Sequence, residues 1–371
     1  MESQQSTVES RGVEESRSRG ETGLPASDLR PPTSDWFRWL VVASLIVTVW
    51  FTWPLWQVRE APPLLPAVAG LPAFDVGLPL IGALIAAIFA PVLGMAAATL
   101  LVIYAVLADQ TRLQPEVVSL LFLLWGTLPF PIARGFARAH LISLWFFSGL
   151  NKLLSPAFFN EMAPFLLSAF IPEPQPWQGI GFGYLLAFGE LGLGVLAIVP
   201  RTRRLAAFLA FALHAGILLT LSPLGIDRNS AVWPWNVALA FAGFAFIAPW
   251  RDSVLTSLIQ APRWARAGML LLALMPLGFF VGRVDAYLAH NLYSSSIARA
   301  EVKCRVACFQ MQDPANTWTS LNVPLPPEHR LFEQYFALTC RRGDMMRIVD
   351  PRAWYRMQGL SERVLTCPGR G

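Results

Sequence analysis

One lysine lies in an otherwise apolar stretch of the sequence, WFFSGLNKLLSP, at position 152. The chain has 29 lysines and arginines; its lysines are Lys152 and Lys303, which leaves 27 arginines. Arginine keeps its proton near neutral pH, whereas a desolvated lysine can lose it and act as a base or nucleophile. A lysine near a helix end can also serve as an interfacial anchor. Because this chain otherwise uses arginine, we keep both roles for Lys152 as alternatives: a chemical role and an anchoring role.

Two further ionisable residues, Glu190 and His214, lie in the middle of apolar runs. A charge inside a membrane span costs roughly 3 kcal/mol or more, so each is a candidate for function. Both lie about ten residues from the segment PRTRR that would join their helices, so they should share one depth and could touch. Such a pair could exchange protons in acid–base catalysis. The alternative, slightly favoured, is a polar clamp between helices that Gly189 and Gly192 allow to approach.

Polar and aromatic residues gather at the ends of the expected helices on one side of the membrane. An amide that enters a span needs a hydrogen-bond partner, whereas single tryptophans also fit the aromatic belt of a membrane interface. We expect these residues to line a substrate pocket under the C-terminal region. They are Asp109, Arg112, Asn151, Asp227, Asn229, Trp233, Trp235 and Asn236.

The composition places these residues in a polytopic membrane protein. Of 371 residues 54% are hydrophobic and 14% are charged, which excludes an ordinary soluble domain. Residues 1–35 carry seven acidic and four basic residues and little to bury, and are expected to form a disordered tail. The net charge of +5 comes from scattered arginines, so nucleic acid is not an expected partner.

The apolar runs predict an all-α membrane domain over residues 36–282. The run at 77–108 is one kinked helix or two, and the enrichment of arginine in cytoplasmic loops decides between them. With two helices and a cytoplasmic N-terminus, eight loop arginines lie inside and three outside. With one helix, everything after residue 108 changes sides and those eight arginines lie outside, against the rule. We therefore expect nine spans: 36–56, 77–90, 92–108, 117–131, 139–154, 181–199, 205–222, 233–249 and 267–282.

This topology exports residues 283–371, which we expect to form a small α+β cap on the outer helix ends. The cysteines, Cys304, Cys308, Cys340 and Cys367, all lie in this region, where disulfides can form. Cys304 and Cys308 alternate with valines as on a strand, about 13 Å apart, and cannot bridge each other. Each is expected to pair with Cys340 or Cys367. Redox or zinc roles fit the spacing less well, and no metal is expected.

One part of the sequence resembles the HTTM membrane domain of vitamin K-dependent γ-glutamyl carboxylases and their bacterial relatives. It is the segment Phe146-Phe147-Ser148-Gly149-Leu150-Asn151-Lys152-Leu153, together with the later spans that carry Glu190 and His214. Other features are similar to DoxX-like proteins. The resemblance covers residues 36–282. It implies that Lys152 is the base that deprotonates reduced vitamin K, and that His214 matches a later histidine. Asn151 replaces the first lysine of a pair, and the exported region is small, so the resemblance implies chemistry on a quinone-like lipid rather than on protein glutamates.

Two functions therefore remain open. The first is a membrane-embedded oxidoreductase or carboxylase-like catalyst with Lys152 as base, tuned by Glu190 and His214, with a reduced quinone as the expected lipidic substrate. The second is a non-catalytic scaffold or partner subunit whose cap recruits another exported protein. A transporter is disfavoured because the sequence shows no paired halves. Either protein would lie in the bacterial inner membrane, with its C-terminal region outside the cytoplasm.

Overall fold

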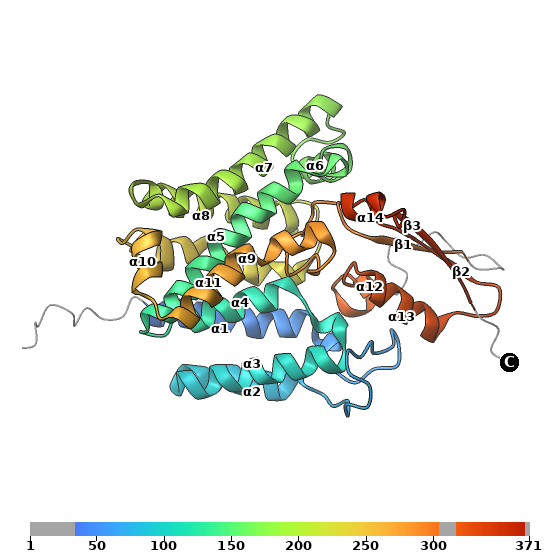
Figure 1. Cartoon of the computed structure of the whole chain (residues 1–371), viewed down its shortest axis with the longest axis horizontal. Coiled ribbons are helices and arrows are strands. Elements are labelled where there is room, and N and C mark those ends of the chain that lie inside the picture. Colours follow the sequence, from blue (N-terminus) through green and yellow to red (C-terminus); the bar gives the residue numbers. More distant parts are fainter. Residues whose placement is uncertain (1–33, 304–316, 368–371) are drawn as a thin grey trace, which may run out of the picture. The chain divides into compact units, whose positions relative to one another are not determined.

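The computed structural model describes residues 34–303 and 317–367, and these belong to one compact unit. The expected disordered tail lies outside the described residues except at its last two positions, and Cys304 and Cys308 also lie outside them. The described chain is mostly helical, with a small three-stranded sheet near its C-terminal end (Figure 1). The coarse prediction of a helical domain with a C-terminal α+β part is confirmed.

In the described part of the chain, a helix lies in each range predicted as a span. These helices are α1 (Ser34–Phe51), α2 (Gly77–Phe89), α3 (Pro91–Ala108), α4 (Pro115–Gly126), α5 (Pro131–Leu153), α7 (Pro176–Ile198), α8 (Arg203–Leu221), α9 (Trp233–Ala242) with the π-helical turn η7 (Gly243–Ile247), and α11 (Arg263–Leu274) with the 3-10 turns of η8 (Met275–Val281). The connections contain η2 (Trp53–Trp56), η3 (Gln110–Arg112), η4 (Phe158–Met162), α6 (Ala163–Leu167), η5 (Pro200–Thr202), η6 (Ser230–Val232) and α10 (Val254–Gln260).

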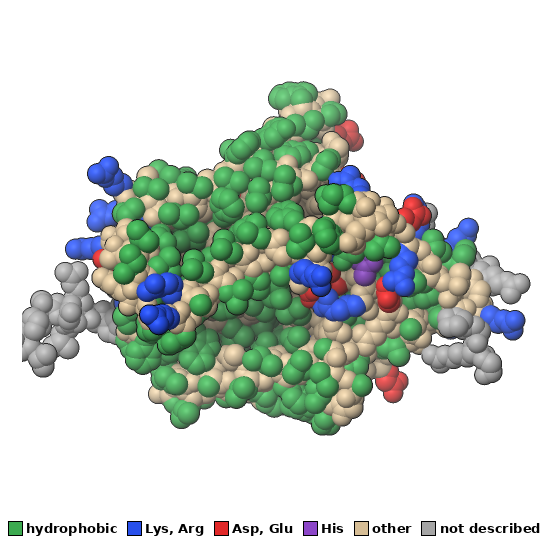
Figure 2. Space-filling model, in the orientation of Figure 1, with side chains coloured by type: hydrophobic (Ala, Val, Ile, Leu, Met, Phe, Trp, Pro, Cys, Tyr) green, Lys and Arg blue, Asp and Glu red, His purple; other side chains and the backbone are tan. Residues whose placement is uncertain are grey.

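Five helical segments among the described residues are long and apolar enough to cross a membrane. They are Pro91–Ala108, Pro176–Ile198, Pro200–Leu221, Ser230–Ile247 and Arg263–Val281, while α2 and α4 are apolar but shorter. Apolar side chains cover most of the helical surface, and lysines, arginines and acids gather toward its two ends (Figure 2). Such a surface is typical of a protein that is solvated by lipid.

The run at 77–108 forms two helices rather than one kinked helix. Ala90 leaves helical geometry (φ −127°, ψ 75°), and Pro91 begins α3 because a proline needs no hydrogen-bonded N–H in the first turn. The two helices then pack closely, since a Cβ on Gly94 would collide with the backbone of Ala86 and Ala87. The prediction of two helices in this range is therefore confirmed.

Helices α5 and α7 approach each other most closely at two glycines. A Cβ on Gly149 would collide with the backbone of Ala187 and Leu191, and a Cβ on Gly194 would lie 2.8 Å from the backbone nitrogen of Phe146. The expectation that Gly189 and Gly192 allow α7 to approach α8 closely was wrong, because a Cβ on either would meet open space. The face of α7 that packs on α5 carries Gly194 instead, and it brings Glu190 toward the C-terminal end of α5.

The C-terminal region folds around an antiparallel sheet in the order β1 (Arg299–Lys303), β2 (Met345–Val349), β3 (Glu362–Thr366). Helix α13 (His329–Thr339) buries Leu331, Phe332 and Phe336 against Met346 and Ile348 of β2, so a helix packs on the sheet as expected of an α+β region. Two short helices, α12 (Thr317–Leu321) and α14 (Ala353–Met357), complete this region. We call residues 283–303 and 317–367 the cap.

A buried polar cluster within the cap joins the starts of α13 and α14 to the segment that follows η8. Arg352 lies 2.6 Å from Asp350 Oδ2 and 3.6 Å from Glu328 Oε2, and Glu328 Oε1 accepts from the backbone N–H of Ala286 (2.7 Å). Burial raises the pKa of Glu328. Burial alone would also raise the pKa of Asp350, but hydrogen bonds from His329 and Arg352 hold that pKa below its ordinary value. The cluster fixes how α13 and α14 are oriented.

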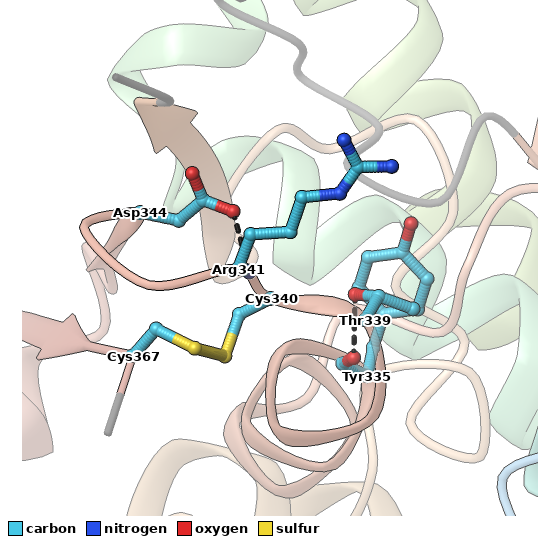
Figure 3. Close-up of a disulfide and its surroundings, with 6 residues drawn as sticks. All are labelled: Tyr335, Thr339, Cys340, Arg341, Asp344 and Cys367. Carbon is cyan, nitrogen blue, oxygen red and sulfur yellow. Dashed lines mark hydrogen bonds between the residues drawn. A yellow bond between two sulfur atoms is a disulfide. The ribbon is translucent and has the colours of Figure 1, made fainter. Parts of the chain in front are cut away.

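The disulfide of the described residues joins Cys340, after α13, to Cys367, after β3 (Figure 3). The expectation that Cys340 and Cys367 pair with Cys304 and Cys308 was therefore wrong. The reason is the sheet register: Met345 pairs with Thr366, and the backbone N–H of Cys367 donates to Asp344 O (3.0 Å). This alignment leaves the Cα atoms of Cys340 and Cys367 5.8 Å apart, within the usual range for a disulfide.

Replacing both Cys340 and Cys367 by alanine is expected to destabilise the cap by ~2–4 kcal/mol, because the disulfide closes a loop with a sequence separation of 27 residues. Thermal unfolding of the full chain, followed by limited proteolysis of the cap, measures this loss. Non-reducing peptide mapping is the control and should recover the Cys340 and Cys367 peptides linked. A linkage of either cysteine to Cys304 or Cys308 would contradict the register described above.

Candidate functional site

An apolar cavity of about 450 Å³ lies within the helical domain, between α5, α7, α8 and α9. Most of its wall consists of leucines and other apolar side chains, and a few polar groups face into it. The polar lining residues are Ser148, Lys152, Glu190, His214, Thr220, Asn236 and His290, with Trp145, Trp235 and Tyr293. An apolar pocket with a small number of converging polar groups is the usual form of a small-molecule site.

The Lys152 ammonium and the Glu190 carboxylate form a buried ion pair on the wall of this cavity. Lys152 Nζ lies 2.5 Å from Glu190 Oε2 and donates a second hydrogen bond to Ser148 Oγ, 2.8 Å away. Lys152 is 4% exposed and Glu190 6%, so little solvent screens the pair. The lysine therefore does not extend to an interface as an anchor; it is held inside the bundle by an acid from the neighbouring helix.

His214 is held by two side chains rather than by Glu190. The indole N–H of Trp145 donates to His214 Nε2 (3.1 Å), and His214 Nδ1 lies 2.9 Å from Asn236 Oδ1. Because an indole nitrogen can only donate, Nε2 accepts, and the proton of a neutral ring lies on Nδ1, where it donates to the amide oxygen. Asn236 Nδ2 in turn donates to Val232 O (2.9 Å). The arrangement orients a neutral imidazole beside the ion pair.

Two polar nitrogens on the cavity wall lack a hydrogen-bond partner within the described residues. They are Trp235 Nε1, from α9, and His290 Nε2, from the segment after η8. A buried polar group without a partner costs ~1–3 kcal/mol, so such groups are rare unless a ligand or a water satisfies them. Both side chains line the cavity, but neither nitrogen has appreciable accessible surface, so the accessible polar chemistry of the site rests on the Lys152–Glu190 pair.

The predicted residues Asp109 and Arg112 lie outside this cavity and hold the long connection after α1. Asp109 is fully buried and accepts from Arg59 Nη2 (2.6 Å) and Thr111 Oγ1 (2.8 Å). Arg112 donates to the backbone oxygens of Leu55 (2.8 Å) and Gln57 (2.9 Å). With their hydrogen-bonding capacity used in this way, these two side chains stabilise the fold around η2 and η3.

The remaining predicted residues lie nearer the cap. Asn151 donates to Ala289 O (2.9 Å), Trp233 donates to Arg228 O (3.2 Å), and Asp227 is exposed in a left-handed turn (φ 47°). Asn229 donates to Tyr293 Oη and lines a separate cavity of about 470 Å³ between the helix ends and the cap. Of the candidate residues, the structure therefore gathers Lys152, Glu190, His214, Trp235 and Asn236 at one cavity.

Sequence reasoning did not select several residues of the site. Trp145, Ser148 and Lys152 share one face of α5 at spacings of three and four, a helical signal that could have identified the first two. His290 and Tyr293 reach the cavity from an irregular segment, where no periodicity could have indicated it. His140 was also overlooked; it is buried in α5, 2.7 Å from Ser119 Oγ, with its ring 5.4 Å from that of His290.

No protein-family model, curated protein or solved structure matches this chain.

Proposed function

We propose that the protein is an integral membrane catalyst of the HTTM-like class that acts on a lipid-soluble, quinone-like substrate with Lys152 as the general base. The observation that carries the proposal is the Lys152–Glu190 pair, buried on the wall of an apolar cavity. A reduced quinone fits these features, because it combines an apolar ring and tail with hydroxyl protons that a base can remove.

The ion pair supplies a path for the substrate proton. Lys152 as an ammonium cannot accept a proton, but it can pass one to Glu190 Oε2, 2.5 Å away. In a dry cavity the neutral amine and neutral acid avoid the cost of two buried charges, so this transfer is accessible. When a substrate hydroxyl gives its proton to Lys152 Nζ, the pair becomes an ammonium facing the new oxyanion. Lys152 then stabilises the charge that its own action creates.

The cavity has a lateral opening on the apolar outer surface between α7 and α8, which suits a substrate dissolved in the bilayer. Among its lining residues, Leu185 of α7 is 69% exposed and Leu209 of α8 is 44% exposed. Gly189 and Gly216 also line it, and a Cβ added to either would meet open space. These two glycines leave room for an apolar chain to pass between the helices.

The topology that we propose has nine spans, with the N-terminus in the cytoplasm and the cap outside it. Two observations support it: the eight arginines that this topology assigns to the inner loops, and the disulfide between Cys340 and Cys367, which suits an oxidising compartment. The bacterial inner membrane fits both. In this orientation Lys152, near the C-terminal end of α5, lies toward the outer surface.

A second candidate function is a non-catalytic scaffold whose cap binds an exported protein. The observation that favours it is that the same ion pair joins α5 to α7 and therefore has a structural use. Arginine at position 152 would preserve that use, but it could not act as a base. The two functions thus differ in their response to a single substitution at Lys152.

Oxygen uptake tests the catalytic proposal. Removal of a hydroquinone proton promotes its oxidation, in which two electrons and two protons pass to O₂ and yield the quinone and hydrogen peroxide. We expect the purified full chain in lipid nanodiscs to accelerate oxygen uptake by a naphthohydroquinone with an isoprenoid tail. A rate equal to that of empty nanodiscs would defeat the proposal.

The lateral opening gives a matched pair of variants for this assay. Gly216→Trp should obstruct passage between α7 and α8 and lower the uptake rate at low substrate about tenfold, chiefly through KM, because a closed entrance hinders binding rather than chemistry. Gly82→Trp makes the same change at an exposed helical glycine of α2 that does not line the cavity, and should leave the rate unchanged. Equal rates for both variants would show that substrate does not enter here.

A further inference from the structure

A second apolar cavity, of about 630 Å³, lies at the other end of α5, between α5, α10 and α11. Its wall includes Ile142, Phe146, Leu258, Met269 and Leu274, and it shares no lining residue with the Lys152 cavity. Its volume falls within the roughly 300–1,000 Å³ typical of ligand pockets. Because the two cavities are separate, an inference about this one does not depend on the proposed function.

The guanidinium of Arg138 faces this apolar cavity with unused hydrogen-bond donors. Arg138 Nε donates to Phe246 O (3.0 Å), and its guanidinium carbon lies 4.8 Å from the ring centre of Trp250. Its two terminal nitrogens donate to nothing in the part of the chain that the structure describes. A guanidinium that is held on one side and free on the other is suited to bind a phosphate or a carboxylate.

Arg203 packs on the same indole, but its guanidinium nitrogens, unlike the terminal nitrogens of Arg138, all donate hydrogen bonds within the described residues. Its guanidinium carbon lies 3.6 Å from the Trp250 ring centre, and its three nitrogens donate to the backbone oxygens of Ala197, Ile198, Trp250 and Asp252, at 2.7 to 3.1 Å. Arg203 is therefore a structural residue that anchors the connection after η7. The neighbouring Arg138 is not used in this way.

The cavity is open to the apolar outer surface of the bundle. Three of its lining residues, Ile198 of α7 and Leu270 and Leu274 of α11, are 41%, 42% and 54% exposed. Exposed apolar side chains next to an apolar cavity place its mouth where acyl chains would lie in a membrane. A lipid could thus enter without leaving the bilayer.

We propose that this cavity binds an anionic glycerophospholipid, with an acyl chain among the apolar residues and the phosphate accepting hydrogen bonds from Arg138. Among the described residues, two arginines, Arg134 and Arg203, and one carboxylate, that of Asp252, act electrostatically on Arg138, so the local charge favours an anionic headgroup. Basic pockets between membrane helices are known to bind anionic headgroups. The site is a binding site for a structural or regulatory lipid, distinct from the substrate cavity.

Native mass spectrometry of the detergent-solubilised full chain tests this site with dioleoylphosphatidylglycerol and dioleoylphosphatidylcholine as probes. Wild-type protein should bind phosphatidylglycerol more tightly than phosphatidylcholine. Arg138→Gln should weaken phosphatidylglycerol binding about tenfold, because it removes a charge-assisted hydrogen bond. The control Arg201→Gln, at an exposed arginine that lines none of the three cavities described here, should bind like wild type.

A second variant tests the acyl-chain part of the site and remains informative if Arg138→Gln does not fold. Ala139→Phe keeps the guanidinium but fills the cavity, and it should also weaken phosphatidylglycerol binding about tenfold, since the chain then loses its buried apolar area. Unchanged binding by Ala139→Phe would overturn the proposal. So would equal binding of the two lipids by wild type, or binding of inorganic phosphate as tight as that of phosphatidylglycerol.

Discussion

Substitution of Lys152 by arginine is expected to lower hydroquinone-dependent oxygen uptake by about 10²–10⁴-fold, the usual contribution of a general base. Arginine retains the positive charge and can keep an ion pair with Glu190, but its guanidinium does not release a proton in a protein. The loss should therefore appear in kcat, with the folded protein still in the membrane. The measurement is the oxygen electrode assay with purified variants in nanodiscs.

The control for this substitution is Lys303→Arg, which makes the same change at the other lysine of the chain, in β1 of the cap. It should leave oxygen uptake unchanged. Lys152→Arg should also avoid the loss of ~3–5 kcal/mol in the free energy of unfolding that follows removal of one partner of a buried ion pair, because the charge pair persists. If Lys152→Arg turned over hydroquinone as fast as wild type, Lys152 would be a structural partner of Glu190 and the scaffold function would be favoured.

The sequence predicted the helices well because a membrane imposes a length and a polarity on them. A helix lies in each predicted range. The division of the run at 77–108 into α2 and α3 was predicted from the distribution of arginines in the loops, and in the structure Pro91 begins α3. In the cap, the spacing of Leu331, Phe332, Tyr335 and Phe336 is likewise that of one face of a helix, α13. These signals are local, so a single sequence contains them.

The partners within the site could not be predicted from the same signals. Counting residues from the connecting loop gave Glu190 and His214 a similar depth, and both line one cavity. Depth does not give the direction in which a side chain points around its helix. Here Gly194 and Gly149 set the contact between α5 and α7, so Glu190 meets Lys152, while His214 meets Trp145 and Asn236.

Residues outside the helices were least predictable. Asp109 and Arg112 looked like pocket residues because they are polar, but their partners in the connection after α1 use their hydrogen bonds. Conversely, His290 lay in a segment assigned to the exported region, and the structure turns it back toward His140 and the cavity. Both errors arise from irregular backbone, whose path depends on tertiary contacts that no sequence period records.

Replacing Glu190 by leucine is expected to lower the free energy of unfolding by ~3–5 kcal/mol, because it leaves the Lys152 ammonium buried without a compensating charge. The hydrogen bond to Ser148 Oγ and the ring of Phe158, 5.9 Å away, would remain, and neither carries a compensating charge. The double variant Lys152→Met/Glu190→Leu removes both charges and keeps similar side-chain volumes. It should recover most of the lost stability, since an apolar pair of similar size is often as stable as a buried ion pair.

A double-mutant cycle over wild type, Lys152→Met, Glu190→Leu and the double variant measures this coupling by denaturant unfolding in detergent micelles. A small change for Glu190→Leu alone would contradict the buried pair at 2.5 Å. The same four proteins in the oxygen uptake assay separate stability from chemistry. The double variant should be as well folded as wild type and still inactive, because an ion pair that only joins two helices can be replaced by packing, whereas a base cannot.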